Sequence, residues 1–328
     1  MKKSLLVIIA VVMGIFFSMG SVNTYAANPV KKHGQLKVKG VNLVDKKGKT
    51  FRIKGFSTHG INWFEDYVNR DAFRDVKKMG INCIRLAMYT SDYNGYCSGG
   101  NKKHLESVID RGVKACKAEG IYVIIDWHIL NDSNPNINIK QSKKFFKKMS
   151  KKYKKYNNVL YEICNEPNGS TTWSEIKKYA KKIIKVIRKN DKKAVIIVGT
   201  PNWSQRIDEA ANSPLKGVKN IMYAMHFYAA THKAELRNLI PAARKKGLPI
   251  FISESNICEA SGNGRIDKTE GKRWFKTIRK YKLSCVAWSL CNKDESASLI
   301  KPSVKRVKEF KKKHLSNTGK WYVKMFKK

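Results

Sequence analysis

The chain has 328 residues, and its 67 Lys and Arg outnumber its 25 Asp and Glu to give a formal net charge of +42. This length is enough for one large domain, and the seven cysteines contain no Cys-x-x-Cys pair, which argues against a zinc site, a redox site or a disulfide scaffold. Because seven is an odd number, at least one thiol is free or paired between chains. The charge would suit a polyanionic partner, but the lysines recur in pairs within helical patterns and no recognised nucleic-acid motif accompanies them. We therefore predict a solvated lysine-rich surface and no nucleic-acid partner, with attraction to anionic cell-wall polymer or acidic polysaccharide as the alternative.

The first 26 residues have the pattern of a secretory leader. Lys2 and Lys3 give it a positive start, residues 5–17 are almost wholly apolar, and Ala26 ends a small-residue cleavage site. The apolar run is short for a bilayer span, so an uncleaved membrane anchor is the less favoured alternative. We predict that residues 1–26 are a signal peptide, that the protein is secreted to the extracellular space, and that residues 27–328 form one domain.

Strand-like and helix-like patterns alternate along the rest of the chain. Alternating residues at 34–40 and 51–55, on either side of a polar turn at 45–48, predict a β-hairpin. Short continuous apolar runs are typical of buried parallel strands, and they occur at residues 55–57, 83–86, 122–126, 159–164, 195–199, 221–225, 250–253 and 285–290. Amphipathic stretches predict helices at residues 71–79, 103–119, 140–156, 173–190, 234–246, 267–281 and 304–314.

Strands and helices that alternate in this way predict an α/β fold of the (β/α)₈ or TIM barrel type. We expect the early hairpin to close the barrel at its amino-terminal bottom. Gly80, Gly120 and Gly247 each follow a helical stretch, as glycines at helix ends do. The sequence has no linker rich in Ser, Pro or Gly, no internal repeat and no appended binding module, which supports a single domain.

Two of the apolar runs lead directly into a carboxylate. Glu166 stands in Asn165-Glu166-Pro167 after the run at 159–164, and Glu254 follows the run at 249–253. Acids at the carboxyl ends of barrel strands lie where these folds build active sites, and two carboxylates on one face suit glycoside hydrolysis. One such Glu alone would be as well explained by an ordinary loop carboxylate, but the pair favours catalysis.

Other polar and aromatic residues are predicted at the same rim. They are His59, Arg85, Asp126, Trp127, His128, Asn165, His226, Phe227, Tyr228 and Trp288. Arg85 is expected to keep Glu254 ionised and oriented, and Tyr228 to donate a hydrogen bond to Glu254. His226 is expected to position Glu166, Asn165 to donate to a sugar hydroxyl, and Trp288 to offer a flat face to a sugar ring. Each of these residues alone has a structural alternative. Arg85 would be explained by a structural ion pair, Trp288 by packing in the core, and His128 by a hydrogen bond at the barrel rim.

From about His33 to at least Ser303, the chain resembles a glycoside hydrolase family 5 endoglucanase, a cellulase of the Bacillus and clostridial branch. The motifs that carry the resemblance lie at residues 57–60, 87–90, 122–132, 162–169, 197–200, 203–205, 225–228 and 260–264. The resemblance implies a retaining endo-β-1,4-glucanase (EC 3.2.1.4) in which Glu166 is the acid/base and Glu254 the nucleophile. It also implies supporting roles for Arg85, His128, Asn165, His226 and Tyr228, and contact with the glucan by His59, Trp63, Tyr89, Trp203, Trp288, Lys293 and Glu295.

The same resemblance implies a monomer that uses a β-glucan substrate and needs no metal or cofactor. Mannan, xylan and mixed-linkage glucan remain open as substrates, because contacts along the cleft set the choice of sugar. A non-catalytic glycan-binding barrel is the alternative from a different class. One departure stands out, since the family carries an aromatic residue and a glycine after the nucleophile, where this chain has Ser255 and Asn256. We expect this change to loosen or strain the loop that carries Glu254.

Overall fold

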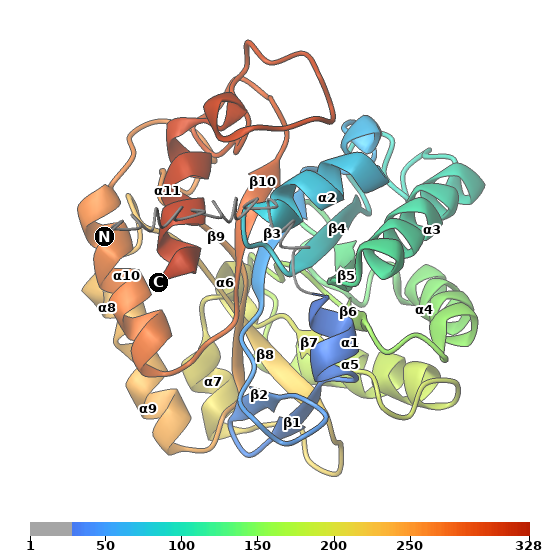
Figure 1. Cartoon of the computed structure of the whole chain (residues 1–328). Helices are drawn as coiled ribbons and strands as arrows, with labels where there is room; N and C mark the ends of the chain where they lie inside the picture. Colours follow the sequence, from blue (N-terminus) through green and yellow to red (C-terminus); the bar gives the residue numbers. More distant parts are fainter. Residues whose placement is uncertain (1–27) are drawn as a thin grey trace, which may run out of the picture.

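Eight parallel strands close into a barrel in the computed structural model, which describes residues 28–328 (Figure 1). The strands follow one another around the barrel in chain order, and the last pairs with the first. Their bounds are β3 Lys54–Thr58, β4 Cys83–Tyr89, β5 Tyr122–His128, β6 Val159–Glu162, β7 Ile196–Val198, β8 Ile221–Tyr228, β9 Ile250–Asn256 and β10 Cys285–Leu290. The predicted α/β barrel is confirmed, and all eight predicted strands are present.

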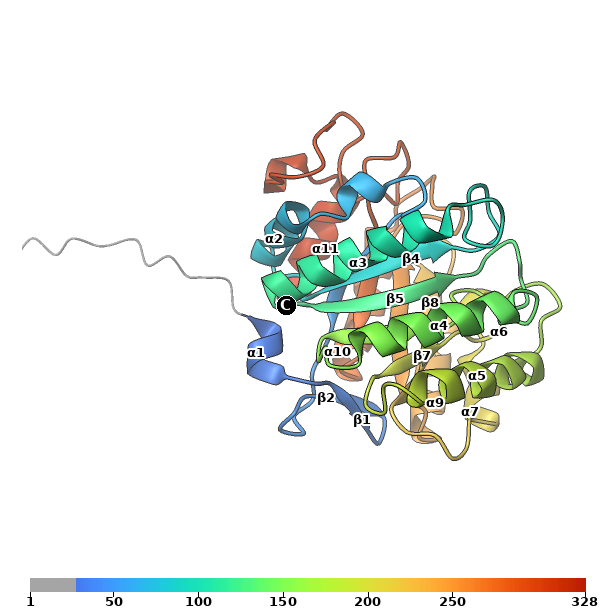
Figure 2. The same ribbon diagram turned by 90° about the vertical axis from the view of Figure 1, so that its right-hand side faces the viewer.

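Helices cover the outside of the barrel. Figure 2 shows α3, α4 and α5 side by side along the strands, whose arrowheads point to the right of that view. The helices are α1 Pro29–His33, α2 Arg70–Lys78, α3 Lys102–Glu119, α4 Ile139–Tyr153, α5 Trp173–Arg188, α6 Pro201–Ser204, α7 Ile207–Asn212, α8 Ala234–Arg237, α9 Leu239–Lys245, α10 Lys268–Lys280 and α11 Asn317–Lys327, with short 3₁₀ turns at Glu65–Tyr67 and Lys312–His314. The predicted helix at 234–246 is interrupted at Asn238, and the sequence did not predict α6 or α7.

Successive residues of a strand serve two different cores. In β5, Tyr122 and Ile124 belong to the cluster inside the barrel, whereas Val123 and Ile125 pack in the layer between the strands and the helices. Side chains alternate across a strand, so a strand buried on both faces needs an uninterrupted apolar run. This double burial explains why the strands were visible as continuous apolar runs.

The barrel is closed at its amino-terminal end by the first part of the chain. Strands β1 Lys37–Lys39 and β2 Asn42–Val44 pair antiparallel, and Leu36, Leu43 and Phe51 pack into the cluster inside the barrel. The predicted closure is therefore confirmed, but the predicted arms are wrong. The tight turn lies between β1 and β2. The turn at 45–48 is bridged by a pairing of Val44 with Thr50 and by the backbone bond from Phe51 to Leu43, and residues 51–53 form no strand.

The predicted helix at residues 304–314 is wrong, since this segment runs as a loop that ends in the 3₁₀ turn at Lys312–His314. Tertiary contacts hold it extended over α2: Asn69 donates to the Val307 carbonyl, and the Phe310 amide donates to Asp75. The last helix is instead α11, which begins after Ser316, whose hydroxyl accepts from the Gly319 amide. Its buried face packs onto the barrel and takes the place of the eighth helix.

The described chain bears on two further predictions from the sequence. All seven cysteines lie in it and each is free, six of them buried. None of the helices between residues 28 and 328 has the length and apolar character to cross a membrane. The predicted signal peptide, residues 1–26, lies outside the described residues.

Candidate active site

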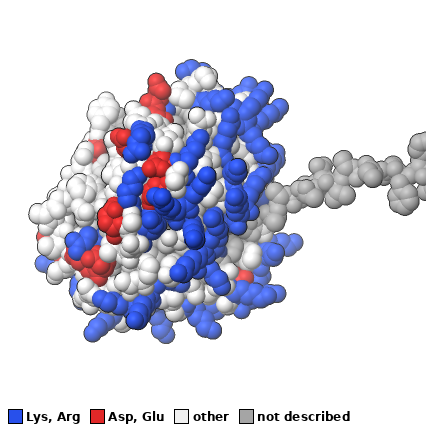
Figure 3. Space-filling model, turned by 90° about the vertical axis from the view of Figure 1, so that its left-hand side faces the viewer, with Lys and Arg blue, Asp and Glu red and all other residues white. Residues whose placement is uncertain are grey.

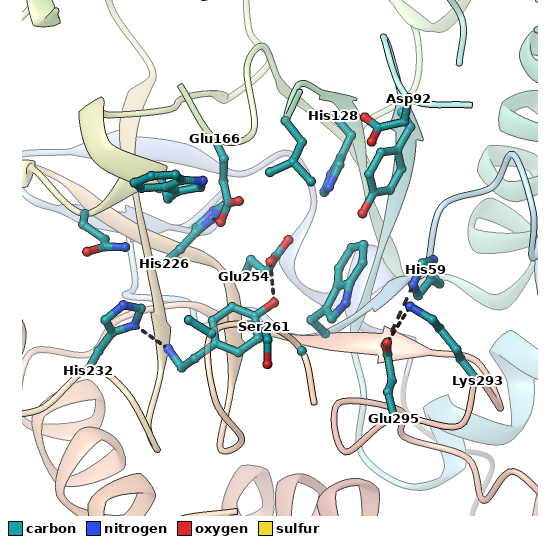
Figure 4. A pocket seen from close by; sticks show the side chains of 18 of the residues that line it. His59, Asp92, His128, Glu166, His226, His232, Glu254, Ser261, Lys293 and Glu295 are labelled. Carbon is teal, nitrogen blue, oxygen red and sulfur yellow. Dashed lines mark hydrogen bonds and ion pairs between the residues drawn. The ribbon is translucent and has the colours of Figure 1, made fainter. Parts of the chain in front are cut away.

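A pocket of about 610 Å³ opens at the carboxyl ends of the barrel strands (Figure 4). The predicted site residues that line it are His59, Trp63, Tyr89, His128, Glu166, Trp203, His226, Tyr228, Glu254, Trp288, Lys293 and Glu295. Arg85, Asp126 and Asn165 do not line it, because they are fully buried among the side chains that support the pocket. Trp127 and Phe227, which were also predicted at this rim, instead pack in the layer between the strands and the helices, because they lie on the outer face of their strands. The barrel thus brings together residues that are as far apart in sequence as His59 and Glu295.

Two carboxylates and one imidazole form the centre of this pocket. Glu166 follows β6, Glu254 lies within β9, and one oxygen of each lies within 4.8 Å of the other and of a nitrogen of His226. Both glutamates are mostly buried, with exposed fractions of 9% and 4%. Carboxylates that are this close and this shielded from water are suited to proton transfer and to nucleophilic attack.

Arg85 organises the layer beneath the pocket. It is fully buried, and its guanidinium contacts Glu162 at 2.7 Å, Glu254 at 3.1 Å and Asp126 at 3.1 Å. Burial disfavours its charge, but these three acids more than compensate and raise the pKa of Arg85 above its ordinary value. The predicted role is therefore matched by the contacts, since a permanent cation fixes one oxygen of Glu254.

The other oxygen of Glu254 accepts a hydrogen bond from the Tyr228 hydroxyl at 2.7 Å. Burial, followed by the charges of Glu254 and Glu166, raises the pKa of Tyr228 well above its ordinary value. The phenol therefore keeps its proton and remains a donor. With Arg85 on one oxygen and Tyr228 on the other, the orientation of the Glu254 carboxylate is determined from both sides.

His226 connects Glu166 to the layer beneath. Its Nδ1 lies 2.9 Å from Glu166, and its Nε2 lies 2.9 Å from Ser253, whose hydroxyl donates to Glu162. Burial alone would lower the pKa of His226, but the carboxylates of Glu162, 3.7 Å away, and of hydrogen-bonded Glu166 raise it to about 9. The ring is therefore protonated at both nitrogens, and it donates to Glu166 from one and to Ser253 from the other.

His128 is the opposite case. Burial, followed by the charge of Arg85, lowers the pKa of His128 to about 3, so the ring is neutral. Its Nδ1 lies 2.6 Å from Asp126, which leaves Nε2 as the acceptor for the Asn165 amide at 3.2 Å. The second hydrogen of that amide bonds to the Ile129 carbonyl, and the amide oxygen accepts from Arg85. Contact between Asn165 and a sugar hydroxyl would therefore require one of these bonds to be exchanged.

Aromatic side chains form the walls of the pocket. Trp63 and Trp203 are 38% and 42% exposed, which is unusual for large apolar residues of this chain, whereas Trp288 is 5% exposed and stacks on His128. Trp203 is held in a left-handed turn with φ of 56°, and its amide donates to the Pro167 carbonyl beside Glu166. Exposed indole rings on a cleft wall are suited to the apolar faces of sugar rings.

A charged group lies at the other end of the pocket. Figure 4 shows His59, Lys293 and Glu295 together, to the right of Glu254 in that view. The Lys293 amine lies 2.6 Å from Glu295, and burial together with the nearby Lys293 charge lowers the pKa of His59 to about 3. A neutral His59 and the ion pair of half-exposed Lys293 with buried Glu295 offer both donors and acceptors to hydroxyl groups.

The comparisons with known proteins agree with this geometry. Residues 44–294 match the model of the cellulase family, glycosyl hydrolase family 5. The chain belongs to glycosyl hydrolase family 5. It is 44% identical to endoglucanase A of Butyrivibrio fibrisolvens, over 90% of this chain and 69% of that protein. It is 42% identical to an endoglucanase of Clostridium saccharobutylicum, over 92% of this chain and 67% of that protein.

Solved structures of family 5 show the same fold. The structure of cellulase Cel5C_n superimposes with a TM-score of 0.89 at 38% identity, over 92% of this chain and 94% of that one. The catalytic domain of Thermobifida fusca endoglucanase Cel5A, in complex with cellotetraose, superimposes with a TM-score of 0.86 at 31% identity, over 92% of this chain and 100% of that one. Family and fold are therefore the ones that the sequence motifs indicate.

The structure overturns the expectation that Ser255 and Asn256 loosen or strain the segment after Glu254. Both residues lie within β9, and neither has a positive φ. Ser255 bonds to the Val286 carbonyl at 2.9 Å and accepts from the Tyr322 hydroxyl at 3.1 Å. The Asn256 amide donates to the carbonyls of Trp288 and Ala297, and its oxygen accepts from two backbone amides. In this chain the segment is a hydrogen-bonded strand that needs no glycine.

Sequence reasoning missed Glu162 and Ser253, which transmit contacts between Arg85 and His226. A signal for them existed in the strand period, because Leu160 and Phe251 face the barrel interior and the residue two positions later faces the same way. It also missed Asp92, His232 and Ser261, which line the pocket from loops. Loop residues have no such period, so only the fold could reveal them.

Glu166, His226 and Glu254 present donor atoms close enough for a cation. However, His226 uses both ring nitrogens in hydrogen bonds, and Glu254 is already neutralised by Arg85. A cation would have to displace these contacts, so the arrangement fits proton chemistry better than metal binding.

Proposed function

We propose that this family 5 protein is a retaining endo-β-1,4-glucanase that hydrolyses internal bonds of cellulose and related β-glucans. The observation that carries the mechanism is the separation of at most 4.8 Å between oxygens of Glu166 and Glu254. Retaining enzymes place their carboxyl groups about 5–5.5 Å apart, whereas inverting enzymes need about 6.5–9.5 Å to admit a water molecule. The relatives named endoglucanases and the related structure with cellotetraose support the glucan substrate.

In the first step, an oxygen of Glu254 attacks the anomeric carbon as the glycosidic C–O bond breaks. Glu166 gives its proton to the leaving oxygen, because an unprotonated sugar alkoxide is a poor leaving group. Arg85 and Tyr228 hold the two oxygens of Glu254 and so limit the orientations that the nucleophile can adopt. A glycosyl ester of Glu254 results.

In the second step, Glu166 removes a proton from water, and the water oxygen attacks the same carbon. The ester bond breaks, Glu254 is released as a carboxylate, and the product keeps the β configuration. His226 contacts Glu166 in both steps and holds its carboxylate in place. The net reaction is hydrolysis of one glycosidic bond.

An azide experiment assigns the two glutamates. On an aryl cellobioside with a good leaving group, Glu166→Ala is expected to form the ester and to yield a β-glycosyl azide when azide is added. Glu254→Ala is expected to react slowly and to yield an α-glycosyl azide, because azide attacks the intact substrate. Glu309→Ala, which removes a 71% exposed carboxylate, is the control and should behave as the unmutated protein. Exchanged product configurations would reverse the two roles.

The substrate is tested with the purified protein on a soluble cellulose derivative, lichenan, xylan and mannan. We expect reducing ends to appear fastest on the cellulose derivative or lichenan, and viscosity to fall before many ends have formed. Faster release of reducing ends from mannan or xylan would show that one of these polymers is the preferred substrate. Release of cellobiose at constant viscosity would show that the enzyme attacks chain ends.

We also propose that the protein is secreted after cleavage near Ala26, and that the mature charge of +40, which is +42 less Lys2 and Lys3, attracts it to anionic polymers outside the cell. Amino-terminal sequencing of the exported protein tests the first statement, and a sequence that begins at Met1 would contradict it. Retention on anionic wall material tests the second. The retained fraction is expected to fall as the salt concentration rises, because salt screens exposed charges. Equal retention at low and high salt would refute the proposed attraction.

A further inference from the structure

A second concave site lies on the outside of the barrel, between α10 and α11. It is a groove of about 600 Å³. The residues that line it are Lys268, Lys272, Arg279, Asn317, Lys320, Trp321, Lys324, Met325 and Lys328. Figure 3 shows the face on which α8 to α11 lie, where Lys and Arg crowd one half of the surface and the opposite edge is mostly white. The groove shares no residue with the catalytic pocket.

The cations of this groove form two rows. Lys320 and Lys324 on α11 and Lys328 directly after it are four residues apart, and on α10, Lys268 and Lys272 have the same spacing. Residues four apart on a helix stand one above the other, so each row lines the groove lengthwise. None of the six cations forms an ion pair with a residue in 28–328, and no acid of that range is in the lining. Like charges this close repel each other, which an anionic occupant would relieve.

The groove also contains two buried donors that lack acceptors. Trp321 is 7% exposed and Arg279 is partly buried, and neither Trp321 Nε1 nor Arg279 Nη1 has a hydrogen-bond partner among the described residues. Buried polar groups are nearly always paired, and an unpaired donor costs free energy. Both donors belong to residues that line the groove, and because the two atoms are almost fully covered, an acceptor that enters the groove pairs with them only after a side-chain shift.

We propose that this groove binds a linear acidic polysaccharide through the carboxylates of its uronate units. Trp321 and Met325 are buried at the groove, so the apolar surface open to a ligand is that of the aliphatic stems of the lysines, and it matches a sugar chain that has apolar faces and carboxylates along its edges. A single-stranded nucleic acid would need exposed aromatic faces on which its bases stack, whereas Trp321 is almost fully covered by the protein.

The proposed function includes an attraction of the protein to anionic polymers, and this proposal locates that attraction in the groove between α10 and α11. It therefore rests on the proposed function. An acidic polysaccharide held between α10 and α11 leaves the catalytic pocket free. The protein would then stay on a polymer that it does not cleave, while the pocket acts on the glucan beside it.

The test uses the full mature protein and a fluorescent oligomer of galacturonate, with binding followed by anisotropy at low salt. The triple variant Lys272→Gln, Lys320→Gln and Lys324→Gln is expected to bind roughly tenfold more weakly, since each exposed ion pair contributes a modest amount. The control variant Lys143→Gln, Lys147→Gln and Lys151→Gln removes the same charge from a row with the same spacing on α4, and it should bind within about twofold of the unmutated protein. Equal losses in both variants would overturn the groove and leave only diffuse attraction.

The indole resonance of Trp321 gives an independent readout. In a ¹⁵N spectrum, assigned with Trp321→Phe, its N–H signal is expected to move when the galacturonate oligomer is added and to stay when neutral cellohexaose is added. A DNA oligonucleotide with the same charge as the galacturonate oligomer serves as the competing ligand. If it bound as tightly as the oligomer and lost the same affinity in the groove variant, the choice of a polysaccharide would be overturned. Hydrolysis of the cellulose derivative should be unchanged in the groove variant. If the unmutated protein bound galacturonate but hydrolysed no glucan, the proposed function would fail and the groove would stand.

Discussion

The protonation of His226 gives a prediction that separates its charge from its shape. The ring is fully buried and bonds to Glu166 and Ser253. Burial lowers its pKa, but the carboxylates of Glu162 and Glu166 outweigh burial and raise it from 6.5 to about 9. Gln has a similar reach and can donate a hydrogen bond, but it cannot carry a proton charge. The variant His226→Gln therefore removes the titration while it keeps a polar side chain at the position.

The direction of the pH dependence of stability follows from the linkage between proton binding and folding. A group whose pKa is higher in the folded state stabilises that state fully below its ordinary pKa, and this stabilisation is lost as pH rises through the folded value. A change from 6.5 to about 9 corresponds to about 3 kcal/mol, at about 1.4 kcal/mol for each tenfold change in proton affinity. The stability advantage of the unmutated protein over His226→Gln is therefore expected to be largest near pH 6 and to fall by about 3 kcal/mol by pH 10.

The assay is guanidinium unfolding of both proteins between pH 6 and pH 10, and the quantity compared is the difference between their unfolding free energies. Groups that do not interact with His226 contribute equally to both proteins and cancel in this difference. His33→Gln is the control, since His33 contacts Asp45 far from the pocket at the bottom of the barrel. A difference for His226→Gln that is constant from pH 6 to pH 10 would refute the reasoning.

Three further predictions concern backbone and packing. Trp203→Gly and Trp203→Ala should weaken cello-oligosaccharide binding to the same extent. The Gly variant should have an unfolding free energy about 1 kcal/mol higher than the Ala variant, because φ at this position is 56°, a conformation that glycine adopts without strain. Equal unfolding free energies would contradict this. Asn256→Gly, which restores the family residue, should destabilise the protein by roughly 1–3 kcal/mol, because the buried backbone amides of Ile257 and Cys258 lose the Asn256 oxygen as their acceptor. A Gly variant that is more stable in thermal unfolding would show that the strand is strained. Tyr322→Phe should cost about 1 kcal/mol through its lost bond to Ser255, and unchanged unfolding would show that this bond contributes nothing.

The strands were the most predictable part of the molecule. The predicted start of each barrel strand lies within one residue of the observed start, as at Cys83 and Tyr122. The ends were less predictable, since β4 continues to Tyr89 and β9 to Asn256, beyond the predicted ends. In β9 the extension consists of the polar residues Glu254, Ser255 and Asn256, where hydrophobicity no longer marks the strand, whereas in β4 it consists of Ala87, Met88 and Tyr89.

The last helix could not be placed from the sequence pattern. The segment at 304–314 has apolar residues at helical spacing, but Asn69 and Asp75 of the α2 region hold it extended through its backbone. Such tertiary contacts leave no local signal. The predicted site residues were found because they lie at or near the carboxyl ends of strands or in the motifs of the family resemblance. Glu162 and Ser253 lie one layer deeper in the strands and take part only through contacts across the barrel.

The change at Ser255 shows how a departure from a family pattern is accommodated by the rest of the fold. An aromatic residue after the nucleophile would bring its own packing to the end of β9, and this chain has a small hydroxyl there instead. The aromatic ring behind the strand comes from α11, where Tyr322 is fully buried and donates to Ser255 from a position 67 residues further along the chain. The same helix supports β3, because Phe326 lies against Phe56. The helix that the sequence pattern failed to place is thus the one that supports the strand of Glu254, so the motif and its support have to be considered together.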